Sequence, residues 1–305
     1  MASSDSNQRK IVTEFPGTIR VYDDGTVERL RDTDFVPPSI SVGGGGVSSK
    51  DVVINSNFSA RLYLPPHCHR KLPLLLYFHG GAFCISSPFC GKYHRYVSRL
   101  AAEARVVVVS FAYRLAPEHP IPAAYDDARA GIRWAVSHRA GNGPEPWLND
   151  HVDFDRVLLS GESAGGNIVH NLAMAVGDPE FGLGVGLSGI ALVCPYFSGS
   201  KPTESEVIHR RPGGGNINPF VGGAPPSAEE LGCQRVAIFV AERDILCDRG
   251  KAYYRSLARS EGQNGKVRVE LVETKGEDHI FHLFNPDCEA AAGLFDSWAS
   301  FINHE

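Results

Sequence analysis

The stretch "RVLLSGESAGGN", Arg156–Asn167, decides the fold, because an apolar run ends there and a helical pattern begins at once. Residues 161–165 read Gly-Glu-Ser-Ala-Gly and match G-x-S-x-G. This pattern is typical of a serine on a sharp strand-to-helix turn, where small neighbours let the hydroxyl project from the edge of a sheet. A merely structural turn is the alternative, since so short a pattern also occurs by chance. The apolar "VLLS" before it and the helical run after it favour the first interpretation, so we predict that Ser163 is a nucleophile.

Strand and helix patterns alternate on both sides of this turn. The runs at 72–78 and 105–113 are continuously apolar, which is typical of strands buried on both faces of a parallel sheet. Helical patterns such as 122–139 lie between such runs. This alternation predicts one doubly wound α/β domain over residues 51–305. Residues 1–50 are polar and then rich in Pro and Gly, so we expect an irregular arm that packs on the main domain.

The bulk composition excludes some classes of protein. A net charge of −5 argues against a protein that mainly binds nucleic acid or an anionic membrane. No apolar run approaches the roughly 20 residues of a membrane span. The first 15 residues lack the apolar core of a secretory signal, so we expect a cytoplasmic protein whose seven cysteines are reduced thiols. The oligomeric state is not indicated.

Two short patterns imitate ligand motifs without the context that such motifs need. Residues 182–189, "GLGVGLSG", lie before a strand pattern rather than between a strand and a helix, so a nucleotide site is not expected. Residues 67–69, "HCH", have no second group of ligands at zinc-site spacing. We therefore predict no metal site.

A serine nucleophile needs a base and an acid that orients the base. On a G-x-S-x-G fold the chain order is Ser, then Asp or Glu, then His, with the partners just after strands. Asp244 follows the strand pattern "VAIFVAE", and His279 lies in the loop after "VELVET". We predict Asp244 as the acid and His279 as the base. Four alternatives are placed less well, in the next helix, within the strand, farther from a strand end and in the tail: Asp248, Glu242, His282 and His304.

The oxyanion donors should come from an earlier loop, and "HGGA" follows the apolar strand "LLLYF". Glycines let the backbone approach a substrate and turn its N–H groups inward. We predict Gly81 and Ala82, together with Ala164, as donors of the oxyanion hole, with Gly80 shaping it. His79 is expected to orient the loop. A plain Gly-Gly turn is the alternative.

Five stretches of this sequence resemble the plant carboxylesterases of the hormone-sensitive-lipase-like group of α/β hydrolases, from about residue 15 to the C-terminus: "HGGAF", "YRLAPEHPIPAAYDD", "GESAGGN", "ERDILCDRG" and "GEDHIFHLF". The resemblance implies the α/β-hydrolase fold, with a mostly parallel eight-stranded sheet flanked by helices and a cap partly from the N-terminal arm. It also implies cofactor-free hydrolysis of small carboxylic esters through an acyl-enzyme. Three aromatic residues are candidates for the substrate pocket, with the apolar core as the alternative: Phe83, Tyr113 and Phe284.

The chain departs from the group in two places. Ala82 stands where the usual third glycine would be, which keeps the N–H but adds a methyl. The stretch around 205–220 is shorter than in the group, where a Trp-containing cap helix normally lies, so the acyl pocket is not carried over.

The same group includes 2-hydroxyisoflavanone dehydratases and gibberellin receptors, so a lyase and a non-catalytic receptor remain alternatives. Ala82 slightly favours the lyase, whereas Ser163 argues mildly against it because part of that branch carries Thr there. The receptors lack the catalytic histidine, whereas this chain has His279, which argues against a receptor.

Overall fold

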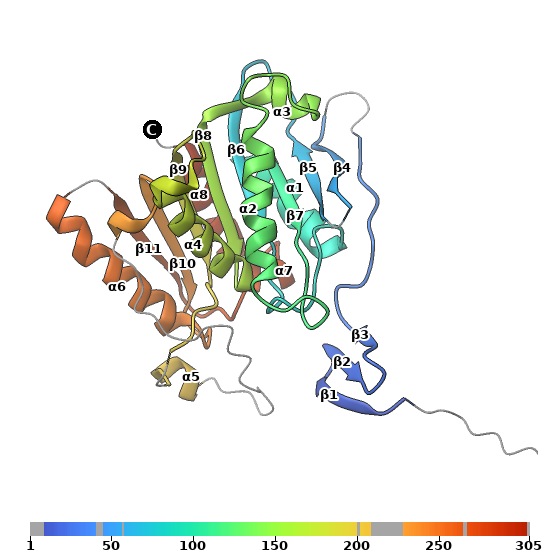
Figure 1. Ribbon diagram of the computed structural model, residues 1–305. Helices are drawn as coiled ribbons and strands as arrows, with labels where there is room; N and C mark the ends of the chain where they lie inside the picture. Colours follow the sequence, from blue (N-terminus) through green and yellow to red (C-terminus); the bar gives the residue numbers. More distant parts are fainter. Residues whose placement is uncertain are drawn as a thin grey trace, which may run out of the picture.

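A computed structural model describes residues 9–40, 45–56, 58–199, 202–208, 228–264 and 267–303. An eight-stranded sheet forms its centre, in the order β11-β10-β9-β8-β6-β7-β5-β4 (Figure 1). Its strands are β4 (Ser48–Asn55), β5 (Phe58–Leu64), β6 (Leu72–Phe78), β7 (Val107–Ala112), β8 (Val152–Glu162), β9 (Leu187–Val193), β10 (Arg235–Ala241) and β11 (Arg268–Thr274). The pairs from β7 to β11 are parallel, and β5 is antiparallel to both neighbours. The predicted mostly parallel eight-stranded sheet is confirmed.

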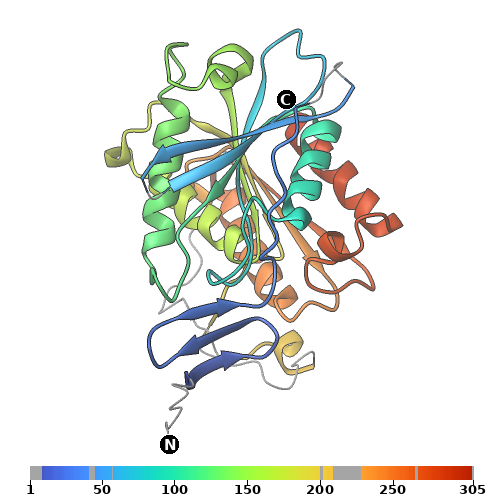
Figure 2. The same cartoon turned by 90° about the vertical axis from the view of Figure 1, so that its right-hand side faces the viewer.

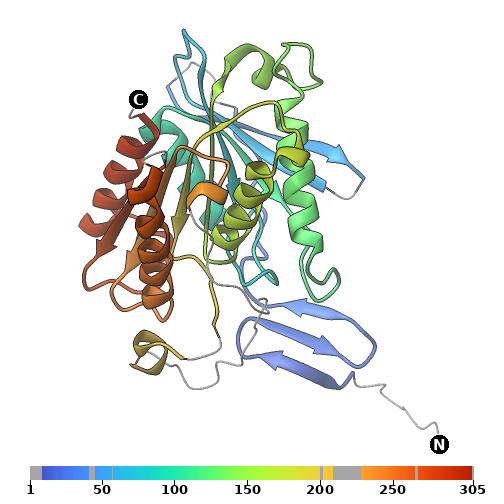
Figure 3. The same ribbon diagram turned by 60° about the vertical axis from the view of Figure 1, so that its left-hand side comes forward.

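Helices cover both faces of this sheet. Helices α2 (Ala123–Val136), α4 (Ala164–Gly177) and α6 (Cys247–Asn264) pack on one face, and α1 (Gly91–Ala104) and α8 (Glu289–Asn303) pack on the other (Figure 2). Figure 3 shows α4 and α6 in front of the sheet, with α8 on the opposite side. The shorter helices are α3 (Pro146–His151), α5 (Glu204–Ile208) and α7 (Phe281–Phe284), with 3₁₀ turns at Pro179–Phe181 and Ala228–Glu230.

Strand β6 explains why two helical layers form. All seven of its side chains are buried. Since successive side chains of a strand point to opposite faces, Leu74 and Leu76 join the α2/α4/α6 core whereas Leu75 and Tyr77 join the α1/α8 core. A strand that is apolar on both faces is stable only when both faces are covered. In the described part of the chain, no helix is long and apolar enough to cross a membrane.

The N-terminal arm is more regular than we expected. Strands β1 (Ile11–Phe15), β2 (Ile19–Tyr22) and β3 (Val27–Arg29) form a separate antiparallel sheet. The hairpin between β2 and β3 turns at Gly25, whose φ of +80° suits a glycine. This sheet lies beyond the end of the main sheet that also carries α5 and α7 (Figure 1). The irregular arm predicted for residues 1–50 is therefore wrong over residues 11–29, and the shortened cap stretch lies largely outside the described residues.

Candidate active site

Ser163 occupies the turn between β8 and α4. Its φ of 51° and ψ of −117° are unusual for a residue with a side chain, and α4 begins at the next residue, Ala164. The Ser163 N–H donates to the Val193 carbonyl at 2.9 Å, which holds the turn against β9. Strained conformations of this kind persist where the surroundings impose them and are common at functional sites. The turn thus has the geometry that G-x-S-x-G predicts.

The glycines of this motif are required by close backbone packing. A Cβ atom on Gly161 would lie 2.5 Å from the Phe78 carbonyl oxygen, and one on Gly165 would overlap that same oxygen. Real Cβ atoms do not approach backbone so closely. Hence β6 and the start of α4 can meet at this turn only if both positions lack a side chain.

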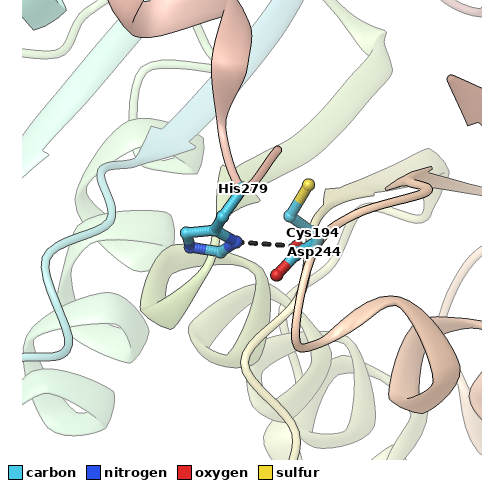
Figure 4. Close-up of side chains that lie close together, drawn as sticks. All are labelled: Cys194, Asp244 and His279. Atoms are coloured by element: carbon cyan, nitrogen blue, oxygen red, sulfur yellow. Dashed lines mark hydrogen bonds and ion pairs between the residues drawn. The ribbon is translucent and has the colours of Figure 1, made fainter. Parts of the chain in front are cut away.

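Asp244 and His279 form a hydrogen-bonded pair. Asp244 follows β10 and is 1% exposed, and His279 follows β11. His279 Nδ1 lies 2.7 Å from Asp244 Oδ2 (Figure 4). A carboxylate in this position fixes the tautomer with the proton on Nδ1, so Nε2 keeps the lone pair of a general base. The sequence order Ser, Asp, His and the placement after strands therefore led to two residues that are in contact.

Cys194 joins this pair to the serine turn. It follows Val193, the acceptor of the Ser163 N–H, and ligand atoms of Cys194, Asp244 and His279 all lie within 4.8 Å of one another (Figure 4). Such a trio could in principle hold a zinc ion. However, burial raises the pKa of the Cys194 thiol well above its usual value, and Nδ1 already engages the carboxylate. These observations favour an acid–base pair over a metal site.

The "HGGA" loop lies directly beside the serine. A Cβ atom on Gly80 would lie 3.3 Å from the Ser163 Cβ, and the Gly80 N–H donates to the Tyr93 hydroxyl at 2.8 Å. That N–H is engaged, which agrees with a shaping role for Gly80 rather than a donor role. Gly81 and Ala82 follow with φ of +114° and +52°. The predicted donors thus lie on a strained loop next to the predicted nucleophile.

His79 holds this loop through a hydrogen bond and an aromatic contact. It is 1% exposed, its Nδ1 lies 2.7 Å from the Gly80 carbonyl oxygen, and its ring stacks on Tyr113 with centroids 4.3 Å apart. The Tyr113 hydroxyl in turn donates to the His79 carbonyl at 2.8 Å. Burial lowers the pKa of His79 to about 4. The imidazole is therefore neutral near pH 7 and donates to the Gly80 carbonyl, as a loop-orienting residue would.

The pocket candidates differ in exposure. Phe83 and Tyr113 are 2% and 3% exposed and belong to the core, whereas Phe284 is 61% exposed and lies 5.1 Å from the Lys92 ammonium. Burial favours the core alternative for the first two. Their role in a substrate pocket stays a prediction.

The structure also separates the alternative acids and bases. The Asp248 carboxylate accepts a backbone N–H of α5 at 2.8 Å, and Glu242 accepts one from the loop after β11 at 2.8 Å. His282 is fully buried, with Nε2 4.0 Å from the Glu162 carboxylate. His304 lies outside the described residues. None of the three described alternatives has the Asp244–His279 geometry.

Tyr93 is a site residue that the sequence did not single out. It lies on the buried stripe of α1, and its hydroxyl accepts the Gly80 N–H. Helical spacing predicts that such a residue is buried but does not indicate where its polar atom bonds. No sequence signal distinguishes it from Tyr96 on the same stripe.

Comparison with known proteins identifies the family of the fold. A family model described as the alpha/beta hydrolase fold matches residues 75–218 and 216–283. A 2-hydroxyisoflavanone dehydratase from Glycyrrhiza echinata is 42% identical, over 99% of this chain and 100% of its own. Probable carboxylesterase 2 from Arabidopsis thaliana is 40% identical, over 98% of each chain.

A solved structure has the same fold. EstE1, a thermophilic carboxylesterase cloned from a metagenomic library, superimposes with a TM-score of 0.68 at 26% identity, covering 86% of this chain and 90% of its own. The chain therefore belongs to the α/β hydrolase family, in company with plant carboxylesterases and 2-hydroxyisoflavanone dehydratases.

Proposed function

We propose that the protein is a serine carboxylesterase that hydrolyses small carboxylic esters. The hydrogen bond between His279 and Asp244, 2.7 Å long, is the observation that carries this proposal. It supplies an oriented base at the carboxyl ends of the same parallel sheet that presents Ser163 on a strained turn. Chemistry collects at that edge in open α/β sheets.

The reaction proceeds in two halves. His279 Nε2 takes the hydroxyl proton of Ser163 as Oγ attacks the ester carbonyl, and Asp244 stabilises the imidazolium. The tetrahedral intermediate collapses, and the alcohol leaves with the proton from His279. Water, deprotonated by the same histidine, then attacks the acyl-enzyme, which releases the acid and restores the serine. Every step is a proton or acyl transfer, so the proposal needs no cofactor.

The oxyanion is stabilised by backbone N–H groups of Gly81, Ala82 and Ala164. Each such donor lowers the barrier by about 2.7–4 kcal/mol where it has been measured by removal. Ala164 opens α4, so its N–H also benefits from the positive end of the helix. The strained loop beside Ser163 supports the other two assignments.

Replacement of the nucleophile tests the proposal. Ser163→Ala should abolish turnover of p-nitrophenyl butyrate by the purified protein. Ser160→Ala is the matched control, because that hydroxyl lies on β8 three residues before Ser163 and is buried with no hydrogen-bond partner among the described residues. The control should retain wild-type activity. An unchanged rate in Ser163→Ala would defeat the assignment.

A dehydratase is the second candidate, favoured by the 42% identity to 2-hydroxyisoflavanone dehydratase. In that reaction His279 would remove a proton beside a carbonyl, the oxyanion donors would stabilise the enolate, and a β-hydroxyl would leave as water. The serine nucleophile is then dispensable. Ser163→Thr should leave elimination intact and lower hydrolysis if this candidate holds.

A non-catalytic receptor is the weakest candidate function, since His279 and Asp244 retain the hydrogen bond of an acid–base pair. Detectable hydrolysis by purified protein excludes it. A cytoplasmic location, and the absence of nucleic-acid or membrane partners, rest on the sequence alone.

A further inference from the structure

The loop that carries the proposed oxyanion donors is strained over several residues. Positive φ angles occur at Gly81, Ala82 and Phe83, and again at Ser86, with values of 114°, 52°, 63° and 74°. Three of these residues have side chains, for which this region is unfavourable. Such a run persists only when contacts from outside impose it.

Some of the contacts that hold this loop are backbone hydrogen bonds close to it. The Gly81 carbonyl accepts the N–H groups of Cys84 and Ile85 at 2.9 and 3.0 Å, and the Phe83 carbonyl accepts the Ala116 N–H at 2.8 Å. These bonds close the loop on itself and on the segment after β7. They leave the Cys84 carbonyl and the Ser86 hydroxyl to other partners.

Arg29, the last residue of β3, holds the Cys84 carbonyl. Its Nε donates to that oxygen at 2.7 Å, and one terminal nitrogen donates to the Ala116 carbonyl at 3.2 Å. Both terminal nitrogens also donate to the Glu118 carboxylate at 2.7 Å. A planar guanidinium can donate hydrogen bonds to three acceptors at once, whereas a lysine ammonium cannot reproduce this fixed, forked geometry of donors. Arg29 thus ties the N-terminal arm to the oxyanion loop and to the segment after β7.

Asp32 holds the other end of the loop. Its Oδ2 accepts the Ser86 hydroxyl and the Lys92 ammonium, the latter at 2.8 Å. Burial opposes the charge of Asp32, but the hydrogen bonds from Lys92 and Ser86 outweigh it and lower the pKa of the carboxyl. Ser86 is therefore anchored to a charged acceptor that comes from the arm.

The arm continues past the start of α1. Asp34 accepts the Gly91 N–H at 2.8 Å, and the Val36 N–H donates to the Phe89 carbonyl at 2.9 Å. Figure 2 shows the chain after β3 running alongside α1 on its way to β4. Residues 29–36 therefore contact the loop from Cys84 onwards and the first residue of α1, Gly91.

We propose that Arg29 and Asp32 are positioning residues, which hold the loop of Gly81 and Ala82 in the strained conformation that presents the oxyanion donors. This inference rests on the proposed function. It gives the N-terminal arm a part in catalysis beyond the cap that the resemblance implies. The two residues act through the backbone of the loop and do not touch the substrate.

The test compares Arg29→Met and Asp32→Ala with Arg20→Met in the full chain. Arg20 is the matched control, because it lies on β2 of the same arm and pairs with Glu14 and Glu28 on that sheet. We expect the first two variants to lower kcat for p-nitrophenyl butyrate by about 10- to 100-fold with KM within about threefold, because only the transition state needs the donors. Arg20→Met should stay within about twofold of wild type.

Two further measurements separate positioning from general damage. A trifluoromethyl ketone forms a tetrahedral adduct with Ser163, so its inhibition constant should rise by the same factor as kcat falls. Amide hydrogen exchange over residues 80–89 should become about tenfold faster in both variants. If Arg29→Met does not fold, Arg29→Lys takes its place, since it keeps the charge but not the fork.

Wild-type kcat, inhibitor affinity and exchange in both loop variants would overturn the inference. A lower kcat with unchanged inhibitor affinity and exchange would overturn it as well, because the loss would arise elsewhere. If the wild-type protein itself shows no ester hydrolysis, the proposed function fails, and the exchange comparison alone then decides whether Arg29 and Asp32 hold the loop.

Discussion

His279 Nδ1 lies 2.7 Å from one oxygen of Asp244, and the other oxygen of that carboxylate accepts the Leu246 N–H at 2.9 Å. The carboxylate is thus fixed by its own backbone turn before it orients the imidazole. It is almost completely buried, so few alternative rotamers are open to it. The Asp244–His279 pair therefore forms one unit, in which the carboxylate determines which nitrogen of the imidazole carries the proton.

Asp244→Asn should lower kcat for ester hydrolysis by about 10⁴-fold, because an amide can stabilise the wrong tautomer of His279. KM and the midpoint of urea unfolding should change little. Asp248→Asn is the control, since Asp248 lies four residues farther on and bonds α5 instead. A greater loss of kcat in the control than in Asp244→Asn would contradict the assignment of the acid.

Gly165→Ala should lower both the free energy of unfolding and the esterase activity. The new methyl would overlap the Phe78 carbonyl, so β6 and α4 must separate at the serine turn. Overpacking of this kind costs about 1–3 kcal/mol in the free energy of unfolding. Gly293→Ala is the matched control, because Gly293 lies in α8 with no atom within 4 Å of an added Cβ, and it should gain about 0.5–1 kcal/mol. Urea titration measures both, and equal effects would contradict the packing argument.

The sequence predicted those parts of the molecule that depend on short-range pattern. The strands around 72–78 and 105–113 are apolar on both faces and had to be covered on both, and Ser163 is marked by glycines that the packing of β6 on α4 requires. The small N-terminal sheet was missed although "DDG" at 23–25 is a typical hairpin turn, because the polar composition around it suggested an irregular arm.

Contacts between polar residues far apart in the chain could not be predicted. Arg29 and Cys84 are 55 residues apart, and neither the periodicity nor the composition of the sequence pairs them. The same holds for Tyr93, whose helical spacing indicates burial but not its bond to Gly80. Asp244 and His279 could be predicted from chain order because each follows the end of a parallel strand. Parallel strands bring their carboxyl ends to one edge of the sheet, so residues that follow them lie close together.

Stability should fall as the pH drops from 6.5 towards 4. The pKa values of His79 and His170 are both lowered to about 4 by burial. Between 4 and about 6.5 the unfolded chain binds these protons and the folded chain does not, so the free energy of unfolding rises with pH in that window. For each histidine, the free energy of unfolding should fall by about 1–2 kcal/mol between pH 6.5 and 5.

His170→Phe tests the sign of this effect. The ring packs between Phe197 and Tyr253, so phenylalanine fits the same aromatic cluster without a titrating group. Urea midpoints at pH 7 and pH 5 should differ less in this variant than in wild type. His69→Asn, on an exposed loop, is the control and should show the wild-type difference. An equal or steeper loss at pH 5 in His170→Phe would contradict the lowered pKa of His170.

Ala82→Gly introduces a third glycine into the proposed oxyanion loop, and we expect it to change stability and specificity separately. Ala82 has a φ of 52°, so glycine relieves strain there and should raise the free energy of unfolding by about 1 kcal/mol. Removal of the methyl should also raise kcat/KM for p-nitrophenyl hexanoate relative to the acetate. Ala104→Gly is the control for flexibility, because Ala104 closes α1 away from the loop; it should lower stability and leave the ratio of the two esters unchanged. Lower stability in Ala82→Gly would mean that the methyl, despite its strained backbone, packs usefully against the site.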